Sequence, residues 1–268
     1  MNKEERLSLG PLTTEEEKHY MARLLDKVHI AERTRRIQTT DFIDPHLQQL
    51  SNRLIINYPE VNFIFDGGSI NSERKRLIIC PQFCELASNE EYVALLDCEG
   101  NCPPQKYIAA KITHRDFLGT FLGTGIRREK LGDIWPLEKG CVIAVAREIT
   151  DYLGQQPLKV KGVPLQIKEI EPGSFQTEDK DSKIIETTVS SVRLDAVAAA
   201  GFATSRSKLT REILAGRFKV NWQEIARLDY QLNEGDVISC RGRGRVVIES
   251  IHGQTKKGRI KLSLKRLN

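Results

Sequence analysis

The run from Arg193 to Ile238 constrains the fold most, because two short helix signals are followed there by strand signals. "SVRLDAVAAAGF" and "SRSKLTREILAG" each place apolar residues on one side of a helix and reach a glycine near their end. "RFKVN" and "DVISC" read as strands, and the turn residues Asn233 to Asp236 precede the second. This part of the chain is therefore expected to combine two short helices with several strands.

The second of these helices has a basic side. Ser205 is placed to cap its start, and Gly216 is expected to end it in a left-handed turn. Its apolar side is predicted to hold Leu209, Ile213 and Leu214. The side left facing outward holds Arg206, Lys208 and Arg211. Such a helix is either a solvated charged face or a surface for an anionic partner.

The distribution of charge favours the anionic partner. The whole chain carries 41 Lys+Arg and 36 Asp+Glu, a net charge of only +5. Residues 188–268, however, hold 16 basic and 7 acidic residues, a net of +9, so the rest of the chain is slightly acidic. Arg241 and Arg243 add two guanidinium groups that alternate with glycine, a pattern suited to phosphate oxygens. One basic domain in a weakly charged chain favours a nucleic-acid or anionic-surface partner for that domain.

The remaining sequence divides into segments by pattern. The first, residues 1–72, is expected to be helical, with starts at Thr13 or Thr14 and after Asp44. Residues 73–171 mix strands with two helices and are expected to form an α+β domain of split β-α-β type. Residues 172–187 have the polar composition of a linker, and residues 188–268 form the basic segment.

The basic segment resembles the S-four RNA-binding domain, also called the alpha-L motif. The matching residues run as R193-L-D, S205-R-S, I213-x-x-G216-x-x-x-V220-N221 and L232-x-x-G235-D236-x-I238. The resemblance implies contacts with folded RNA from the start of the first helix and from the second helix. It thereby implicates five residues, namely Arg193, Ser205, Arg206, Lys208 and Arg211, with Arg241 and Arg243 as weaker additions.

Two catalytic interpretations of this segment are disfavoured. Ser205 and Lys208 have the S-x-x-K spacing of penicillin-binding enzymes, but the S-D-N and K-T-G elements of those enzymes are missing from the sequence. Pseudouridine synthases use the aspartate of a G-R-L-D motif as nucleophile, whereas Asp195 follows Val192-Arg193-Leu194. Asp195 is expected to pair with a nearby basic group, and no enzymatic activity is predicted.

A longer resemblance comes from the middle of the chain. The run from Thr113 to Trp135, together with Gly67-Gly68 and the "ERKR" that begins at Glu73, resembles the YlmH-like family. Members have a helical N-terminal part, an RRM-like middle domain and a C-terminal S-four domain, and the family implies RNA binding at the ribosome. Within it, the chain looks most like the cyanobacterial photosystem II S-four domain subgroup. A possible second RNA contact is predicted at Arg127, Arg128 and Lys130.

Four cysteines raise a zinc hypothesis, because Cys80, Cys84, Cys98 and Cys102 form a C-x3-C…C-x3-C pattern. Cys80 and Cys98 fall in or beside expected strands, where cysteine behaves as a small buried hydrophobe. Buried or loose thiols are therefore favoured over a metal site, and no cofactor is expected.

The sequence thus predicts a non-catalytic, monomeric RNA-binding protein of the cytoplasm that takes no small-molecule substrate. Its expected partner is ribosomal RNA or tRNA on the large ribosomal subunit, in translation or ribosome-associated quality control. The alternatives are an RNA-modifying enzyme and an assembly factor associated with photosystem II.

Overall fold

A computed structural model describes residues 14–82, 92–103, 107, 110–171, 174–175 and 182–267. The chain divides into two compact units, Met1–Thr177 and Glu178–Asn268. The α+β class expected from the sequence is confirmed, because helices accompany three antiparallel sheets. Within the described ranges, no helix is long and apolar enough to cross a membrane.

Two helices begin the first unit, and both start where the sequence predicts. Helix α2 spans Glu15–Thr34, and a reciprocal pair of hydrogen bonds of 3.1 Å joins Thr14 and Glu17 across its first turn. Helix α3 spans Pro45–Ile55, and its N-cap Asp44 accepts a hydrogen bond of 2.9 Å from the backbone N–H of Leu47. Both starts follow from local capping chemistry.

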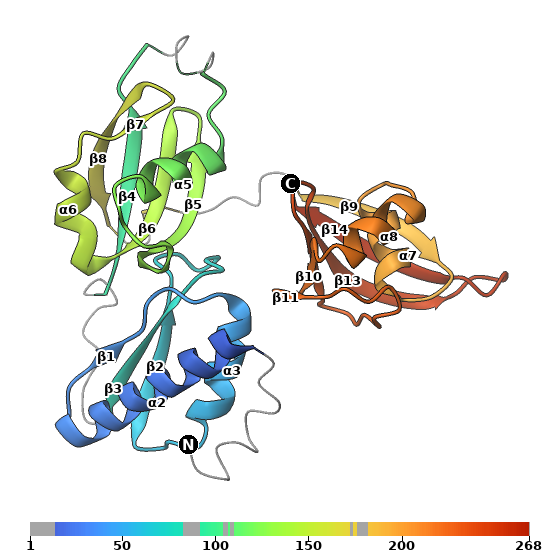
Figure 1. Cartoon of the computed structure of the whole chain (residues 1–268), viewed down its shortest axis with the longest axis horizontal. Coiled ribbons are helices and arrows are strands. Elements are labelled where there is room, and N and C mark those ends of the chain that lie inside the picture. The colour runs from blue at the N-terminus through green and yellow to red at the C-terminus, as the bar shows by residue number, and fades with distance from the viewer. Residues whose placement is uncertain are drawn as a thin grey trace. The chain divides into compact units, whose positions relative to one another are not determined.

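A three-stranded sheet in the order β1-β3-β2 packs against these helices. Its strands are β1 (Gln38–Thr39), β2 (Val61–Asp66) and β3 (Arg76–Pro81). Figure 1 shows α2 and α3 beside this sheet. The domain boundary expected after residue 72 is wrong, because β3 pairs with β2 along its full length. All six residues of β3 are buried, and an apolar run without alternation does not reveal which sheet it joins.

The rest of the first unit contains a five-stranded sheet in the order β5-β6-β4-β8-β7. The strands are β4 (Val93–Gly100), β5 (Leu131–Leu137), β6 (Gly140–Ala146), β7 (Lys159–Val160) and β8 (Val163–Ile170). The helices are α5 (His114–Leu122) and α6 (Thr150–Gly154), with the 3-10 turns η2 (Arg128–Lys130) and η3 (Arg147–Ile149).

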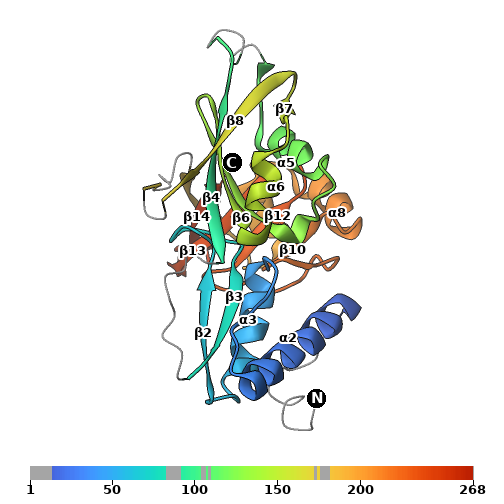
Figure 2. The same ribbon diagram turned by 90° about the vertical axis from the view of Figure 1, so that its left-hand side faces the viewer.

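This connectivity is the split β-α-β arrangement that the sequence predicts. The first strand, β4, lies between β6 and β8, and each of its pairings is antiparallel. Figure 2 shows α5 and α6 on the same side of this sheet. Phe117 and Phe121 of α5 are fully buried in a core with Leu96 and Cys98 of β4. The sequence pattern missed β5, whose "LGDIWPL" has no clear alternation.

Hydrogen bonds join the two sheets of the first unit. The backbone N–H of Phe42 donates to the carbonyl of Glu129 at 2.8 Å. The Arg74 side chain donates to the carbonyl of Phe42 at 2.9 Å and to the carbonyl of Leu131 at 3.2 Å. A side chain at Gly132 would place its Cβ 2.7 Å from the ring of Phe42. The close approach of the 40–43 segment therefore requires glycine in β5.

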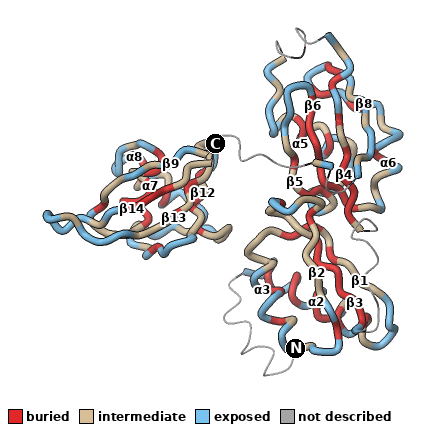
Figure 3. Tube along the Cα trace, turned by 180° about the vertical axis from the view of Figure 1, so that it is seen from behind, coloured by how far each residue is buried: buried red, intermediate tan, exposed pale blue. Residues whose placement is uncertain are grey.

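The second unit has a six-stranded sheet in the order β11-β10-β12-β13-β14-β9. Its strands are β9 (Ser182–Val189), β10 (Phe218–Val220), β11 (Gln223–Glu224), β12 (Val237–Cys240), β13 (Gly244–Gln254) and β14 (Ile260–Leu267). Its helices are α7 (Leu194–Gly201) and α8 (Arg206–Leu214). Figure 3 shows buried positions along the strands of both units.

The expected linker 172–187 overlaps a strand. Residues 182–187 belong to β9, which pairs with β14 from Val189 opposite Ile260 to Ser182 opposite Leu267. Strand β9 lies at the edge of the sheet, and most residues of "SKIIETTV" are exposed or only partly buried. The segment therefore contains many polar residues, which made its sequence resemble a linker.

Candidate nucleic-acid interface

Helix α8 presents the basic side that the sequence predicts. Leu209 and Ile213 are fully buried in the core of the second unit, which fixes the rotation of the helix. Arg206, Lys208 and Arg211 are consequently exposed. The expected apolar role of Leu214 is wrong, because this side chain is 60% exposed on the last turn.

The three cations of α8 face solvent without acidic partners. Arg206 donates to the hydroxyl of Ser190 at 3.1 Å, which steadies one end of the guanidinium group. The side chains of Lys208 and Arg211 make no hydrogen bond or ion pair with any other residue that the structure describes. A cation without a carboxylate nearby keeps its full charge for an external anion. The basic face of α8, defined by these three residues, is therefore open to a partner.

Ser205 occupies the N-cap of α8, as the sequence predicts, with an extended backbone. Its hydroxyl does not make the expected capping bond and lies 3.3 Å from the hydroxyl of Ser207. Because the Ser205 hydroxyl is exposed and uncommitted to the helix backbone, it can donate to or accept from an external group.

Arg193 lies at the start of α7 and is tied to its neighbour. Its Nε atom is 3.3 Å from Oδ1 of Asp195, and its backbone bridges to Gln231. The expected pairing of Asp195 with a nearby base is thus confirmed. With 38% of its side chain exposed, Arg193 retains part of its guanidinium edge for other contacts.

The sequence pattern suggested that Arg243 is free to contact RNA. In this structure its side chain is instead hydrogen-bonded to Glu212. Its Nε and Nη2 atoms donate to the two carboxylate oxygens at 2.9 and 2.8 Å. These hydrogen bonds raise the pKa of Arg243 and lower the pKa of Glu212. The pair links the β12–β13 turn to α8, so its evident role is to hold the basic helix in place.

Arg241 stays exposed in the same turn, where Gly242 and Gly244 have positive φ values of 84° and 87°. Arg217 donates to the Arg241 carbonyl at 3.4 Å. Both arginines line an open hollow of about 600 Å³, together with Lys219 and Arg245. Lys219 lies opposite Ser239, which lies opposite Arg245, so these two cations share a row across the sheet.

The sequence reasoning did not assign Arg217, Lys219 and Arg245 to the site. The signal that could have found Lys219 and Arg245 is the two-residue period of strands, which places alternate side chains on one face. Glu224 also lines the hollow, opposite Lys219.

The second basic cluster is mostly internal. Arg127 is 68% exposed, with Nη2 3.9 Å from Oδ2 of Asp41. Arg128 donates to the carbonyls of Leu131 and Gly132, and its burial lowers the pKa to about 10. Lys130 is held by Asp41 at 2.6 Å and by Glu148 at 2.7 Å. Of the three residues predicted here, Arg127 alone is largely exposed.

The two central strands of the RRM-like sheet lack the aromatic residues on which that fold stacks RNA bases. These strands, "VALLDCEG" and "GCVIAVA", contain no aromatic residue. On the side opposite α5, Val142 and Ala144 are buried in a cluster with Phe42, and Trp135 of the neighbouring β5 packs against it, with its ring centroid 5.3 Å from that of Phe175. The two central strands therefore offer no base-stacking surface.

Asp116 lies two residues after His114 at the start of α5 and is not placed as a general base. Asp116 accepts hydrogen bonds from the backbone N–H and hydroxyl of Thr113 at 2.8 and 2.6 Å, and from Lys161 at 2.9 Å. The Thr113 and Lys161 hydrogen bonds lower its pKa to about 2. A carboxylate that stays ionised at neutral pH as a helix cap is a poor proton acceptor.

The structure does not assemble the predicted cysteines into a metal site within the described residues. Cys80 lies in β3 and Cys98 in β4, which belong to different sheets, and Cys84 lies outside the described residues. No group of three or more His, Cys, Asp or Glu side chains in the described ranges could hold a metal ion. Cys98 instead faces Cys141 across the β4–β6 pair.

Comparison with protein families agrees with this arrangement. Residues 16–83 match a model described as "YlmH, N-terminal", residues 98–173 match "Putative RNA-binding domain in YlmH", and residues 192–238 match "S4 domain". A curated Bacillus subtilis protein, "Ribosome-associated protein quality control protein P2", is 30% identical over 94% of this chain and 95% of its own length. The chain belongs to the YlmH family.

The YlmH resemblance seen in the sequence is thus confirmed, and the cyanobacterial subgroup stays a prediction. A solved structure, "Cell division protein ylmH from Streptococcus pneumoniae", is also similar, with 20% identity and a TM-score of 0.49. The likeness covers 60% of this chain and 95% of that chain. In this YlmH-family chain, α7, α8 and the following strands as far as Ile238 lie within the S4 match.

Proposed function

We propose that this protein binds structured RNA through the basic face of α8, as a non-catalytic factor at cytoplasmic ribosomes. The observation that carries the proposal is the exposure of Arg206, Lys208 and Arg211 without acidic partners on the second helix of an S4 domain. The matches to an S4 domain and to a putative RNA-binding domain support the same conclusion.

The physical basis of binding is electrostatic docking on a folded backbone. Arginine guanidinium groups match phosphate oxygens with paired hydrogen bonds, and lysine adds a mobile point charge. The second unit exposes few aromatic side chains, since Phe202 and Phe218 are buried in its core. It therefore suits shape recognition of folded RNA better than stacking on single-stranded bases.

The proposed target is ribosomal RNA or tRNA on the large ribosomal subunit. The support is the Bacillus subtilis relative, whose name describes a ribosome-associated protein of quality control and which aligns over nearly the whole chain. Association with photosystem II stays a prediction from the sequence and is not needed for this function.

The absence of catalysis is proposed from the state of the titratable groups. Asp195, which would be the nucleophile in a pseudouridine synthase, is paired with Arg193. Asp116 is held ionised by Thr113 and Lys161. Neither carboxylate is poised for proton transfer or nucleophilic attack.

The salt dependence of RNA affinity tests the proposal. About six phosphate contacts predict a log–log slope of roughly −4 with the single-strand coefficient. The variant Arg206→Ala/Lys208→Ala should flatten this slope by about 1.4 units. The matched control Lys256→Ala/Lys257→Ala removes the same charge from the exposed β13–β14 turn and should keep the slope. Equal slopes for wild type and the α8 variant would refute the proposal.

In-cell crosslinking identifies the RNA. Sequencing of RNA crosslinked to the wild-type protein should show clusters in large-subunit ribosomal RNA or tRNA. The α8 variant should lose these clusters, and the control variant should keep them. Scattered crosslinks that ignore both substitutions would mean that the basic face is only a charged surface.

A further inference from the structure

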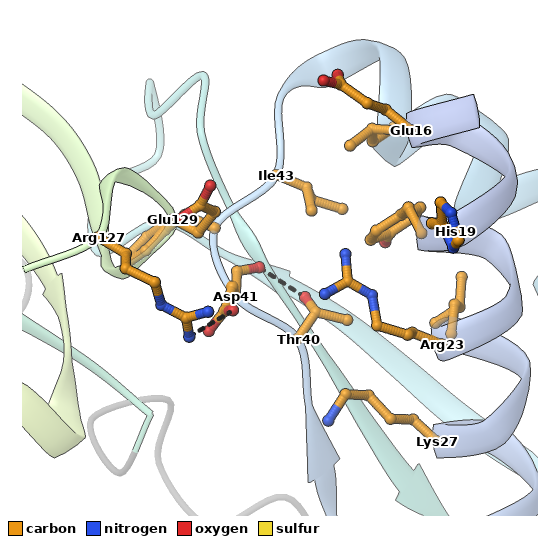
Figure 4. Close-up of a pocket in the computed structure, with 13 residues that line it drawn as sticks. Glu16, His19, Arg23, Lys27, Thr40, Asp41, Ile43, Arg127 and Glu129 are labelled. Atoms are coloured by element: carbon orange, nitrogen blue, oxygen red, sulfur yellow. Dashed lines mark hydrogen bonds and ion pairs between the residues drawn. The ribbon is translucent and has the colours of Figure 1, made fainter. Parts of the chain in front are cut away.

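A pocket of about 430 Å³ lies in the first unit, between α2 and the segment that leads to η2. Its walls come from α2, from residues 40–43 and from Arg127 and Glu129 (Figure 4). The volume falls within the range of about 300–1,000 Å³ typical of small-ligand sites. We call it the α2 pocket.

One wall of the α2 pocket is a row of basic side chains. His19, Arg23 and Lys27 recur every four residues, which places them on one face of α2. Figure 4 shows Arg23 reaching from α2 toward Thr40 and Asp41. Neither the Arg23 nor the Lys27 side chain makes a hydrogen bond or ion pair with another residue in the described part of the chain.

Arg127 contributes a further cation from the opposite wall. Its guanidinium group lies 3.9 Å from Asp41, a contact too long for a hydrogen bond, and the side chain is 68% exposed. Cations from two walls thus border one cavity. Such convergence is the arrangement expected around an anionic group.

Three carboxylates also line the pocket, those of Glu16, Asp41 and Glu129. Asp41 is paired with Lys130, whose Nζ lies 2.6 Å from its Oδ1. Glu16 stands 11 residues before Lys27 on α2, or about 16 Å along the helix axis. Glu129 lines the wall that carries Arg127. The end of the pocket near Lys27 is therefore the more basic end.

The floor of the pocket is apolar and firmly held. It includes Leu24, Phe42 and Ile43, which are 1%, 2% and 5% exposed. The backbone N–H of Phe42 donates to the Glu129 carbonyl, and the Phe42 carbonyl accepts from the Arg74 side chain. These hydrogen bonds fix the floor against the five-stranded sheet. Because these side chains are almost wholly buried, a ligand in the pocket would contact the charged walls and not an apolar surface, and the group that such walls suit is a phosphate.

We propose that the α2 pocket binds one unpaired nucleotide of the RNA partner, with its phosphate on Arg23, Lys27 and Arg127. This inference rests on the RNA-binding function proposed above and adds a site in a different unit from α8. A double helix is too wide for a pocket of this volume, whereas a bulged or looped-out nucleotide is not.

The test compares two fluorescently labelled RNA hairpins, one fully paired and one with a single bulged nucleotide, titrated with the full-length protein. The wild type should prefer the bulged hairpin by about tenfold. Arg23→Ala/Lys27→Ala should reduce that preference toward one. The matched control Lys18→Ala/Arg33→Ala removes two charges from α2 outside the pocket and should keep it.

A photocrosslinking nucleotide at the bulge provides a direct readout. 4-Thiouridine at that position should crosslink to peptides containing residues 19–27 or 40–43, and the pocket variant should lose these crosslinks. Wild-type crosslinks that fall elsewhere, or equal affinity of the wild type for both hairpins, would overturn the inference. An acidic peptide that binds in the pocket without displacing either hairpin would also overturn the inference.

The α8 variant separates this inference from the proposed function. If Arg206→Ala/Lys208→Ala weakens both hairpins equally and the bulge preference persists, the two sites act independently, which supports the inference. If the α8 variant binds as the wild type while the pocket variant loses the bulge preference, the α8 proposal fails and the pocket proposal stands.

Discussion

Arg76 and Glu148 form a two-point ion pair that bridges the two sheets of the first unit. Nη1 and Nη2 of Arg76 lie 2.8 and 3.2 Å from the two carboxylate oxygens of Glu148. Arg76 belongs to β3 and is only 3% exposed, and it also donates to the carbonyls of Thr40 and Tyr92. A single guanidinium group therefore satisfies acceptors from three separate segments.

Replacement of Arg76 should destabilise the first unit strongly. Arg76→Met keeps most of the aliphatic stem but leaves buried carbonyl groups without a donor, and should cost about 3 kcal/mol. Glu148→Gln should cost only about 1 kcal/mol, because the Glu148 side chain is 46% exposed. Urea unfolding followed by tryptophan fluorescence measures both, in a Trp222→Phe background that leaves Trp135 as the reporter. Equal costs for the two substitutions would contradict the bridging role of Arg76.

Low pH should weaken the ion pair between Arg76 and Glu148. Burial alone would raise the pKa of Glu148, but the hydrogen bonds from Arg76 and Lys130 outweigh it and lower the pKa to about 2. A carboxylate with a lowered pKa stabilises the fold above its unfolded value of about 4.3, and this contribution is lost as pH falls toward 2. Between pH 5 and pH 3, the urea midpoint of the wild type should fall further than that of Glu148→Gln. Parallel decreases would show that Glu148 is not responsible.

Arg243 and Arg206 should respond differently to substitution by alanine. Arg243→Ala removes the partner of Glu212 and should lower the melting temperature, while the salt slope of RNA binding stays near the wild-type value. Arg206→Ala should keep the melting temperature and flatten the slope by about 0.7 units. An Arg243 variant with unchanged stability and a flatter slope would instead make Arg243 an RNA contact, as the sequence resemblance implied.

Gly216 should tolerate no side chain. Its φ of +67° lies in the left-handed region, and an added Cβ would lie 2.1 Å from the Glu224 carboxylate. Gly216→Ala should therefore cost about 1–2 kcal/mol, as thermal unfolding can measure. Gly253→Ala is the control, because nothing lies within 4 Å of its added Cβ. Similar melting temperatures for both variants would contradict the conformational argument.

The cysteines should differ in reactivity. Cys98 and Cys141 are fully buried, and the hydrogen bond between them, with burial, raises the pKa of Cys141. Mass spectrometry of alkylated peptides should find these two modified only in denaturant, and Cys102 modified in the native protein. Zinc bound through Cys98 and Cys102 would protect Cys102 as well, and metal analysis of the same sample would reveal it.

The sequence predicts those parts of the fold that depend on local chemistry. Thr14 and Asp44 start helices, and Gly216 ends one, because capping and positive φ are set within a few residues. Helices α5 and α6 and strands β6 and β8 also follow from patterns within short windows, whereas β5 does not. The sheet that β3 joins does not, because a fully buried strand carries no mark of its neighbour.

The sequence predicts which basic residues belong to the site, but not which of them are free of intramolecular ion pairs and so able to contact RNA. Arg243 is 31 positions from Glu212, and Lys130 is far along the chain from Asp41. Such ion pairs depend on tertiary contacts that no local pattern contains. The α2 pocket was missed for the opposite reason. His19, Arg23 and Lys27 carry a helical period that can be read locally, but the apolar residues of α2 drew attention to its buried face.

Strand β9 opens the second unit and strand β14 closes it, and the two are neighbours with Ser182 opposite Leu267. The entry and exit of this unit therefore lie side by side on one edge of the sheet. A module with adjacent ends can be joined to another chain through short tethers, or inserted into a surface loop of a host protein, without pulling its sheet apart. Such portability is a property of the strand pairing itself and requires nothing of the sequence that surrounds it.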